Sequence, residues 1–452
     1  LGGALLMLVG FGMAQAAAGD TALSAFPAAM GSASGVWIFI LLTLGFLSKT
    51  ATLPLHIWLP GAHAEAETDV SPMVSAILLK AGVFGMMLLL LWWKTSPAGV
   101  DEGAAVFLSW LGAVTALMGN IMASFQEDAK RLLAYSSIAQ LGYILFALSF
   151  MNHLGWLSAM TFSINHMIFK ALLFLAIGGV VWRVKTRQMY RMGGLISRMP
   201  ISFLSVLIGI ITVSGVPPLS GFAGKWIIFN AIVLKGWFLQ GAVVIMAGMV
   251  AFLYCFRLIH AIFLGVPKDR FRRVREAPFW ILLPQMILMG AIMAFSMVPN
   301  MVLRPVGRVL SVMFPADALD WQGSRALSAL GYWDGTMIMY ISGGVFVMVL
   351  LWMTATLRRS QKVKALNMVY AGERPYRPET THFAHNFYAP FRKALGFLVP
   401  PLATRFWQGV SDSLLAVSDF GRRIYSGNGQ AYVLHMVLYL LAAFVFWAGV
   451  VS

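Results

Sequence analysis

The chain contains few charged residues. Asp, Glu, Lys and Arg make up 11% of its 452 residues, whereas hydrophobic residues make up 59%. Soluble globular domains carry about 25% charged residues, so this composition excludes an ordinary soluble enzyme. Apolar stretches of about twenty residues recur along the chain, and this length crosses a hydrocarbon core of about 30 Å. The sequence therefore predicts a multi-pass integral membrane protein.

Cysteine and cofactor motifs are also scarce. Cys255 is the only cysteine, which excludes a disulfide framework, a cysteine zinc site and a thiolate-bound cluster. None of the 17 acidic residues lies in the middle of a predicted span, and no cluster of His, Asp and Glu offers a metal site. No glycine-rich loop ends in Gly-Lys-Ser or Gly-Lys-Thr, which argues against ATP-driven transport. We therefore expect no cofactor and no metal in this chain.

The apolar runs predict an all-α polytopic membrane protein with about ten complete transmembrane helices and an N-terminal stub at residues 3–17. The predicted spans are residues 35–59, 72–94, 104–124, 130–150, 154–183, 200–236, 239–264, 277–297, 337–357 and 431–451. The chain opens within an apolar run and without Met, so we expect further helices before Leu1.

The basic residues, which give a formal net charge of +16, gather on alternate connections. They concentrate in residues 130–131, 183–198, 268–275 and 358–423. By the positive-inside rule these loops are cytoplasmic and the C-terminus is outside, as expected for a prokaryotic inner membrane. The basicity therefore indicates orientation and contact with lipids, and we expect no nucleic acid partner.

Two predicted spans are interrupted by proline. Residues 200–236 could form two short crossings, but two crossings would move the 268–275 cluster to the opposite side. A single crossing broken at Pro217 and Pro218 keeps the charge bias, because proline has no N–H to continue a helix. The span at 35–59 is broken in the same way at Pro54. Broken backbone is tolerated in a bilayer only where it is packed in protein or lines a polar cavity.

Each break has a lysine close by, Lys49 before Pro54 and Lys225 after Pro218. Paired interrupted helices are typical of transporters built from repeats, whose sites lie at the breaks. The two segments are too dissimilar for the residues alone to decide whether they form a repeat.

Apart from the cations at the span ends, which belong to the connections, five cations lie within the predicted spans, namely Lys49, Lys80, Lys170, Lys225 and Arg257. A lysine at the bilayer centre costs about 2.5–3.5 kcal/mol, and a lysine held away from water releases its proton more readily. His166 precedes Lys170 by four residues, on the same helix face, and histidine can relay protons. These residues predict a Lys/His chain that carries protons through the membrane interior. Arg257 is close to a basic helix end, and we expect it to extend to the membrane interface.

Two further histidines follow the first break. His56 and His63 either cap the broken helix or take part in the relay, and the residues leave both interpretations open. The acidic loop at residues 65–69 either tunes access to the cytoplasmic mouth or is solvated surface.

Four stretches together resemble one family. They are residues 48–63, residues 128–137 (Asp-Ala-Lys-Arg-Leu-Leu-Ala-Tyr-Ser-Ser), residues 165–175 (Asn-His-Met-Ile-Phe-Lys and onward) and residues 215–225. The chain resembles the antiporter-like membrane subunits of respiratory complex I, Mrp-type cation/proton antiporters and membrane-bound hydrogenase or formate hydrogenlyase complexes. The resemblance is strong over about residues 35–265.

The resemblance implies inverted repeats of five helices and a role for each matching residue. It implies ion translocation by Lys49, Lys80, His166, Lys170 and Lys225, with Lys130 in an orienting, relay or access role. It also implies a glutamate partner for Lys49, two helices earlier, for which this sequence offers no candidate. We divide the chain into an ion-translocating core (1–265), additional spans (266–357), a cytoplasmic-side segment (358–430) and a last span (431–452).

An amphipathic helix is predicted from Leu402 to Tyr425, within the least hydrophobic part of the chain. Its apolar residues recur at helical spacing, which is typical of a helix lying along a membrane interface. In the family, a lateral helix at this place clamps neighbouring subunits, and the short, proline-interrupted form resembles the hydrogenase branch.

The sequence thus predicts a proton- or sodium-translocating subunit of a respiratory redox complex. The driving reaction would occur in a peripheral redox arm, and other membrane subunits would be partners. The alternatives are an Mrp-like secondary antiporter driven by ion gradients and a structural membrane anchor that does not conduct.

Overall fold

The computed structural model describes residues 2–97, 99, 101–264, 267–314, 320–322, 325–357, 389, 393–394, 401–424 and 429–451. It divides into two compact units, residues 1–390 and 391–452. In the described residues, seven helices are long and apolar enough to cross a membrane, or eight if one bent pair forms a single span. This finding confirms a helical membrane protein, but it does not confirm the predicted count of ten spans or the inverted repeat.

The first unit begins with a helical hairpin followed by the first break. Its elements are α1 (Gly2–Ala18), η1 (Leu23–Ala25), α2 (Phe26–Met30), α3 (Gly35–Lys49) and α4 (Trp58–Glu65). The predicted stub is helix α1, which is bent by 74° against the segment Leu23–Met30 and packs against α3. The span expected at 35–59 breaks after Lys49 and resumes at Trp58, as the proline predicted.

Three long spans follow a span that contains a π turn. The elements are α5 (Val70–Met73), the π turn η2 (Val74–Leu78), α6 (Leu79–Thr95), α7 (Glu102–Ser124), α8 (Ala129–Ser149) and α9 (His153–Val184). Asp101, Asp128 and Asn152 begin α7, α8 and α9, where their side chains accept hydrogen bonds from the first N–H groups. Helix α8 packs against α7 and α9, and most of its residues are buried.

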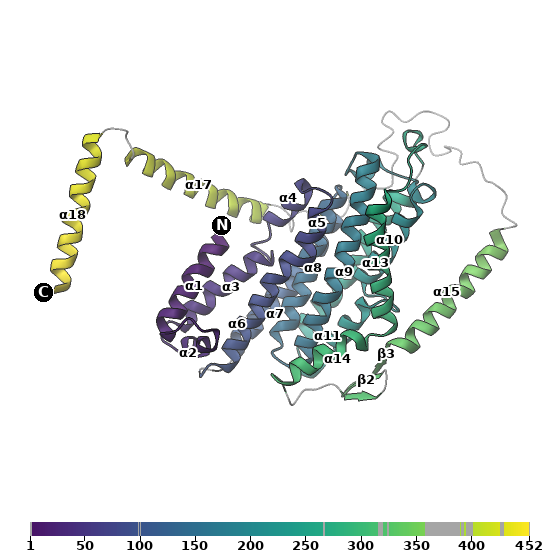
Figure 1. The fold of residues 1–452 in the computed structure, drawn as a ribbon, viewed down its shortest axis with the longest axis horizontal. Coiled ribbons are helices and arrows are strands. Elements are labelled where there is room, and N and C mark those ends of the chain that lie inside the picture. The colour runs from purple at the N-terminus through teal and green to yellow at the C-terminus, as the bar shows by residue number, and fades with distance from the viewer. Residues whose placement is uncertain are drawn as a thin grey trace. The chain divides into compact units, whose positions relative to one another are not determined.

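The second break lies between α10 (Pro200–Ser214) and α11 (Gly221–Lys235), after the short turns η3 (Met189–Arg191) and η4 (Leu195–Ser197). Both helices pack against the long helix α9. Figure 1 places α10 and α11 at opposite ends of the bundle. This is the arrangement of one interrupted crossing, which the charge bias predicted.

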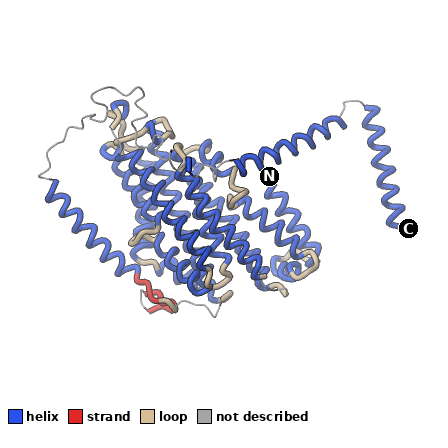
Figure 2. Tube along the Cα trace, turned by 180° about the vertical axis from the view of Figure 1, so that it is seen from behind, coloured by secondary structure: helices blue, strands red, loops and turns tan. Residues whose placement is uncertain are grey.

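The remainder of the first unit combines helices on three predicted spans with elements that the apolar runs did not predict. The elements are α12 (Phe238–Ile259), the π turn η5 (His260–Leu264), η6 (Asp269–Phe271), α13 (Phe279–Met297), α14 (Asn300–Ser311), β1 (Asp320–Gln322), β2 (Arg325–Ser328), β3 (Gly331–Asp334) and α15 (Gly335–Leu357). The three strands form a small antiparallel sheet in the order β1-β2-β3, seen at one end of α15 in Figure 2. Helix α14 and the sheet were not expected.

The second unit contains α17 (Pro401–Ile424) and α18 (Gly429–Val451). These helices fall on the predicted amphipathic segment and on the predicted last span. The rest of the predicted segment 358–430 lies outside the described residues, apart from residues 389, 393 and 394. The division into four parts stays a prediction.

Basic connections of the first unit meet at one end of the bundle. Lys268 Nζ donates to Tyr190 O (2.9 Å), and the Arg270 guanidinium donates to Arg191 O. Arg187 Nε lies 3.3 Å from Asp128 Oδ2. The loops before α8, after α9 and after α12 therefore share one end, which the charge bias required. Their cytoplasmic location stays a prediction.

Candidate ion-translocation site

A lysine and a histidine from two spans meet inside the bundle. His166, on α9, is completely buried, and its Nδ1 shares a hydrogen bond with Nζ of Lys80, on α6. Lys80 Nζ also donates to Ser75 O (2.9 Å). The π turn explains that second contact, because Leu79 N–H bonds to Val74 O, five residues back, instead of the carbonyl four residues back. The irregular turn thus offers a carbonyl to the Lys80 ammonium.

Lys170 follows His166 by one helical turn and is also completely buried. Its Nζ donates to Leu133 O (3.0 Å) and to Ser136 Oγ (2.5 Å), both on α8. Among the described residues, no carboxylate forms an ion pair with Lys170. The cation is therefore held by neutral oxygens alone.

Serine hydroxyls connect these contacts across the helices. Ser137 Oγ, next to Ser136 on α8, donates to Leu133 O (3.0 Å) and lies 3.0 Å from Ser75 Oγ. The π turn that contacts Lys80 and the α8 segment that contacts Lys170 are thus linked by hydrogen bonds. Lys80, His166 and Lys170 therefore form one polar cluster, and their role in ion translocation stays a prediction.

Lys225 lies beyond the second break, on α11, with 8% of its surface exposed. Its Nζ donates to Ser214 O, at the last residue of α10, and lies 5.9 Å from the centroid of the Tyr143 ring. The residue four positions after Ser214 is Pro218, which has no N–H to offer. The break therefore leaves a carbonyl for the lysine, and the Tyr143 ring face adds an attraction for the cation.

Lys49 lies at the end of α3 in different surroundings. It is half-buried and lines a cavity of about 480 Å³ with residues that include Gly3, Met7, Phe46, Trp58 and Gly82. Within the described part of the chain, no hydrogen bond or ion pair involves Lys49 Nζ. Described contacts do not join Lys49 to the Lys80–His166–Lys170 cluster.

Both histidines of the first break are buried. His56 is near the Tyr135 ring, with ring centroids 6.3 Å apart. His63, on α4, is 0% exposed and stacks on Phe174 of α9, with centroids 4.5 Å apart and planes 20° apart. Within the described residues, neither ring nitrogen of His63 has a hydrogen-bond partner. The polar edge of the His63 imidazole is therefore enclosed but unused.

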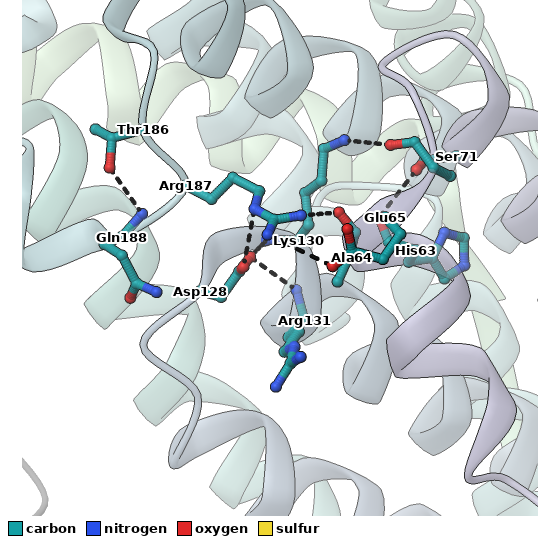
Figure 3. Close-up of polar contacts among 11 residues, drawn as sticks. His63, Ala64, Glu65, Ser71, Asp128, Lys130, Arg131, Thr186, Arg187 and Gln188 are labelled. Atoms are coloured by element: carbon teal, nitrogen blue, oxygen red, sulfur yellow. Dashed lines mark hydrogen bonds and ion pairs between the residues drawn. The ribbon is translucent and has the colours of Figure 1, made fainter.

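Lys130 belongs to a charged network at the end of the bundle where the basic loops meet (Figure 3). Its Nζ donates to Ala66 O (2.8 Å), just after α4. Arg187 lies between Asp128 and Glu65, with Nε 3.3 Å from Asp128 Oδ2 and Nη2 3.6 Å from Glu65 Oε1. These contacts join the start of α8 to the end of α4 and give Lys130 an orienting role.

Several contributing residues were not among the predicted site residues, namely Ser75, Ser136, Tyr143 and Arg187. A pair of serines within the apolar helix at 130–150 was the available signal for Ser136. Arg257 is 2% exposed, and its Nη1 donates to the carbonyl of Ser124 (2.7 Å), the last residue of α7. Its extension to the membrane interface stays a prediction.

The fold and the interior define a class of protein: an integral membrane protein of packed helices with lysines and a histidine inside it. The family model for the transmembrane region of NADH:quinone oxidoreductases and Mrp antiporters matches residues 1–251. The chain belongs to this NADH:quinone oxidoreductase/Mrp antiporter family. The resemblance stated from the four sequence stretches is therefore confirmed.

Relatives in this family work in different settings. Hydrogenase-4 component B of Escherichia coli (strain K12) is 34% identical over 200 residues, which cover 42% of this chain and 30% of that protein. The A/B subunit of a probable K(+)/H(+) antiporter of Rhizobium meliloti (strain 1021) is 35% identical over 320 residues, covering 68% of this chain and 31% of that protein. The chain thus spans about a third of the length of these curated relatives.

A solved structure matches nearly the whole chain. It is a chain of the membrane-bound sulfane sulfur reductase, an archaeal respiratory membrane complex, with a TM-score of 0.86 and 28% identity. The match covers 98% of this chain and 74% of that chain.

Proposed function

We propose that this chain is the ion-translocating membrane subunit of a respiratory redox complex. Ions move along Lys80, His166, Lys170 and Lys225, and electron transfer in partner subunits drives them. Other membrane subunits, a peripheral redox arm and lipids are the partners. The complex lies in a prokaryotic inner membrane with the basic loops on the cytoplasmic side.

The observation that carries this proposal is the buried cluster of Lys80, His166 and Lys170. Two neighbouring cations held away from water without a carboxylate repel each other strongly. A proton that arrives at one member therefore favours release of a proton from the next. Amine and imidazole nitrogens bind protons, whereas hard metal cations prefer oxygen ligands. We therefore favour protons over sodium ions as the cargo.

Redox driving is favoured over a gradient-driven antiporter by the extent of structural similarity. The match to the chain of an archaeal respiratory membrane complex covers 98% of this chain, whereas the Rhizobium antiporter protein aligns with 68% of it. The gradient-driven antiporter is the second candidate, because the Rhizobium protein is 35% identical over the aligned residues.

The identity of the partners tests the redox assignment. The full-length protein would be purified from its native membrane in mild detergent, and its stable partners identified by mass spectrometry. Partners with iron–sulfur or nickel–iron centres are expected. Recovery of small hydrophobic partners alone would instead favour the gradient-driven antiporter.

Replacement of Lys170 tests translocation itself. In the complex reconstituted into vesicles, Lys170→Ala should abolish coupled proton uptake, because it removes the central buried cation. Lys235→Ala is the matched control, because Lys235 is partly exposed and pairs with Glu102 near the bundle surface. Normal pumping by an assembled Lys170→Ala complex would show that the chain is a structural anchor.

A further inference from the structure

A long groove lies on the surface of the bundle between α3 and α7. It has a volume of about 630 Å³ and extends from Val36 and Asp101, near the starts of the two helices, to Leu53 and Pro54 in the first break. Because a helix rises about 1.5 Å per residue, the lining from Val36 to Leu47 spans about 16 Å. The groove therefore leads from the end of the bundle opposite the basic loops down to the first break.

The lining of this groove is mostly apolar and faces outward. Val36, Ile40 and Leu44 of α3 and Phe107 of α7 line it, and all four are exposed hydrophobic residues. In a membrane-spanning chain such a surface faces lipid tails, which are as apolar as leucine. An empty groove would forfeit van der Waals contacts along both walls. A hydrocarbon chain that lies lengthwise in the groove is therefore the occupant that its walls favour.

The deep end of the groove is formed by the first break itself. Leu53, Pro54 and Leu55 line it, while the carbonyl of Leu47 accepts the N–H of Thr52 (3.1 Å). Broken backbone in a bilayer has to be covered by packed groups. A hydrocarbon chain against these three side chains would complete the apolar cover of the break.

One polar side chain lies part of the way along the groove. Thr43, on α3, follows Val36 by seven residues, which is about 10 Å along the helix. It lines the groove and is 7% exposed, and within the described residues its hydroxyl has no hydrogen-bond partner. A helical threonine can bond to the carbonyl four residues back, and a buried hydroxyl without a partner is costly. An occupant with an acceptor oxygen at this depth would satisfy Thr43.

A carboxylate stands at the open end of the groove. Asp101 is exposed, and its side chain accepts the N–H groups of Gly103 (3.3 Å) and Ala104 (3.0 Å), which leaves it further lone pairs. The neighbouring acid Glu102 pairs with Lys235 (3.1 Å), whereas no ion pair among the described residues involves Asp101. The open end of the groove therefore favours a cationic group.

We propose that this groove binds a phospholipid with a primary ammonium headgroup, of the phosphatidylethanolamine class. The ammonium pairs with Asp101, an ester carbonyl accepts a hydrogen bond from Thr43, and one acyl chain lies along the groove and covers the first break. Anionic phospholipids such as phosphatidylglycerol have no ammonium to offer and are repelled by the carboxylate. The inference does not depend on the proposed function, because it rests on a surface remote from the Lys80–His166–Lys170 cluster.

Position-specific crosslinking tests this site. The complex would be reconstituted into vesicles of phosphatidylethanolamine and phosphatidylglycerol, one of which carries a photoreactive group at the end of an acyl chain. Labelled residues are mapped by mass spectrometry, and label at residues 53–55 is divided by label on α15. Helix α15 is the reference for ordinary lipid contact, because none of its apolar window is buried. We expect this ratio to be at least about threefold higher for phosphatidylethanolamine.

Two variants test the two polar contacts. Asp101→Asn removes the charge but keeps the start of α7, because asparagine caps a helix as well as aspartate does. It should lower the phosphatidylethanolamine ratio about threefold. Glu102→Gln is the matched control, because Glu102 is the adjacent acid but does not line the groove. Thr43→Val removes the hydroxyl and should also lower the ratio about threefold. Size-exclusion chromatography checks assembly of each variant.

Equal ratios for the two lipids in the unmodified complex overturn the proposal, whether or not a variant assembles. An unchanged ratio in assembled Asp101→Asn overturns recognition of the ammonium group, and an unchanged ratio in assembled Thr43→Val overturns the placement of the ester. Label on α15 without label at residues 53–55 would show that another polypeptide covers the groove. A loss in Asp101→Asn and Thr43→Val with no loss in Glu102→Gln supports the site.

Discussion

The lysines beside the two helix breaks make different contacts. At the second break the carbonyl of Ser214, the last residue of α10, accepts a hydrogen bond from the lysine across the break, Lys225. At the first break the carbonyl of Ser48, near the end of α3, accepts one from the indole N–H of Trp58 (2.9 Å). Lys49 is thus left out of the bonding that closes its own break and faces a cavity instead.

This difference shows that a break and its lysine are separable features. A proline interruption exposes carbonyls, because the residues that follow cannot continue the helix. Any N–H donor that reaches back can satisfy such a carbonyl, and an indole does so without adding a charge. Lys225 is therefore buried and bonded to the carbonyl at its own break, whereas Lys49 Nζ has no hydrogen-bond or ion-pair partner among the described residues.

The largest expected effect concerns transport by variants of these two lysines. Lys225→Ala should abolish coupled proton uptake, because it removes a buried cation next to Ser214. Lys49→Ala should lower uptake by a smaller factor, because Lys49 has no described contact with the polar cluster. The measurement is proton uptake by the reconstituted complex.

Lys225→Gln accompanies these variants, because an amide can still donate a hydrogen bond but carries no exchangeable charge. Loss of uptake in Lys225→Gln excludes a purely structural explanation. If Lys49→Ala and Lys225→Ala lose the same fraction of proton uptake, the different contacts of the two lysines do not affect transport.

A second expected effect concerns the glycines that allow close packing at the two breaks. A Cβ on Gly221 would lie 1.9 Å from Thr212 O, which is backbone and cannot move aside. A Cβ on Gly82 would lie 2.7 Å from Thr50 Cγ2, at the tip of a side chain. Gly221→Ala should therefore cost more than about 3 kcal/mol of folding free energy, and Gly82→Ala about 1–2 kcal/mol.

Denaturant unfolding of the detergent-purified chain, or the yield of folded chain, ranks the losses of folding free energy in the two variants. Gly61→Ala is the control, because a Cβ there meets nothing within 4 Å and the position is helical. It should be neutral or slightly stabilising. A greater loss in Gly82→Ala than in Gly221→Ala would show that the first break is the more tightly packed one.

The parts of the fold that could be predicted depend on local properties. The breaks follow from prolines without an N–H, and the long spans follow from apolar length. Helix α14 was missed because a search for long apolar runs reads Arg304 and Arg308 as loop residues. Its apolar residues Leu303, Val306 and Leu310 are nevertheless buried on one face. The π turn at Val74–Leu78 was missed because one shifted hydrogen bond leaves no mark on the hydrophobic pattern.

The candidate site also contains some residues that the sequence could predict and others that it could not. Lys80, His166 and Lys170 could be chosen from the sequence, because an ionisable group in an apolar span is costly and needs a reason. Their partners could not be chosen, because Ser75 and Ser136 meet the two lysines only through packing between helices. Serine costs little in a helix, so Ser75 gave no signal, and the Ser136–Ser137 pair did not show which side chain it would contact.

The smallest expected effect tests the uncharged closure of the first break. Trp58→Phe keeps the aromatic packing but removes the N–H that bonds Ser48 O, so it should cost about 0.5–1.5 kcal/mol of folding free energy. Trp37→Phe is the control, because Trp37 is 63% exposed on the apolar surface. Denaturant unfolding of both purified variants measures the difference. If the two variants lose the same free energy, the indole bond does not stabilise the first break. The contrast between an indole-closed and a lysine-closed break would then rest on Lys225 alone.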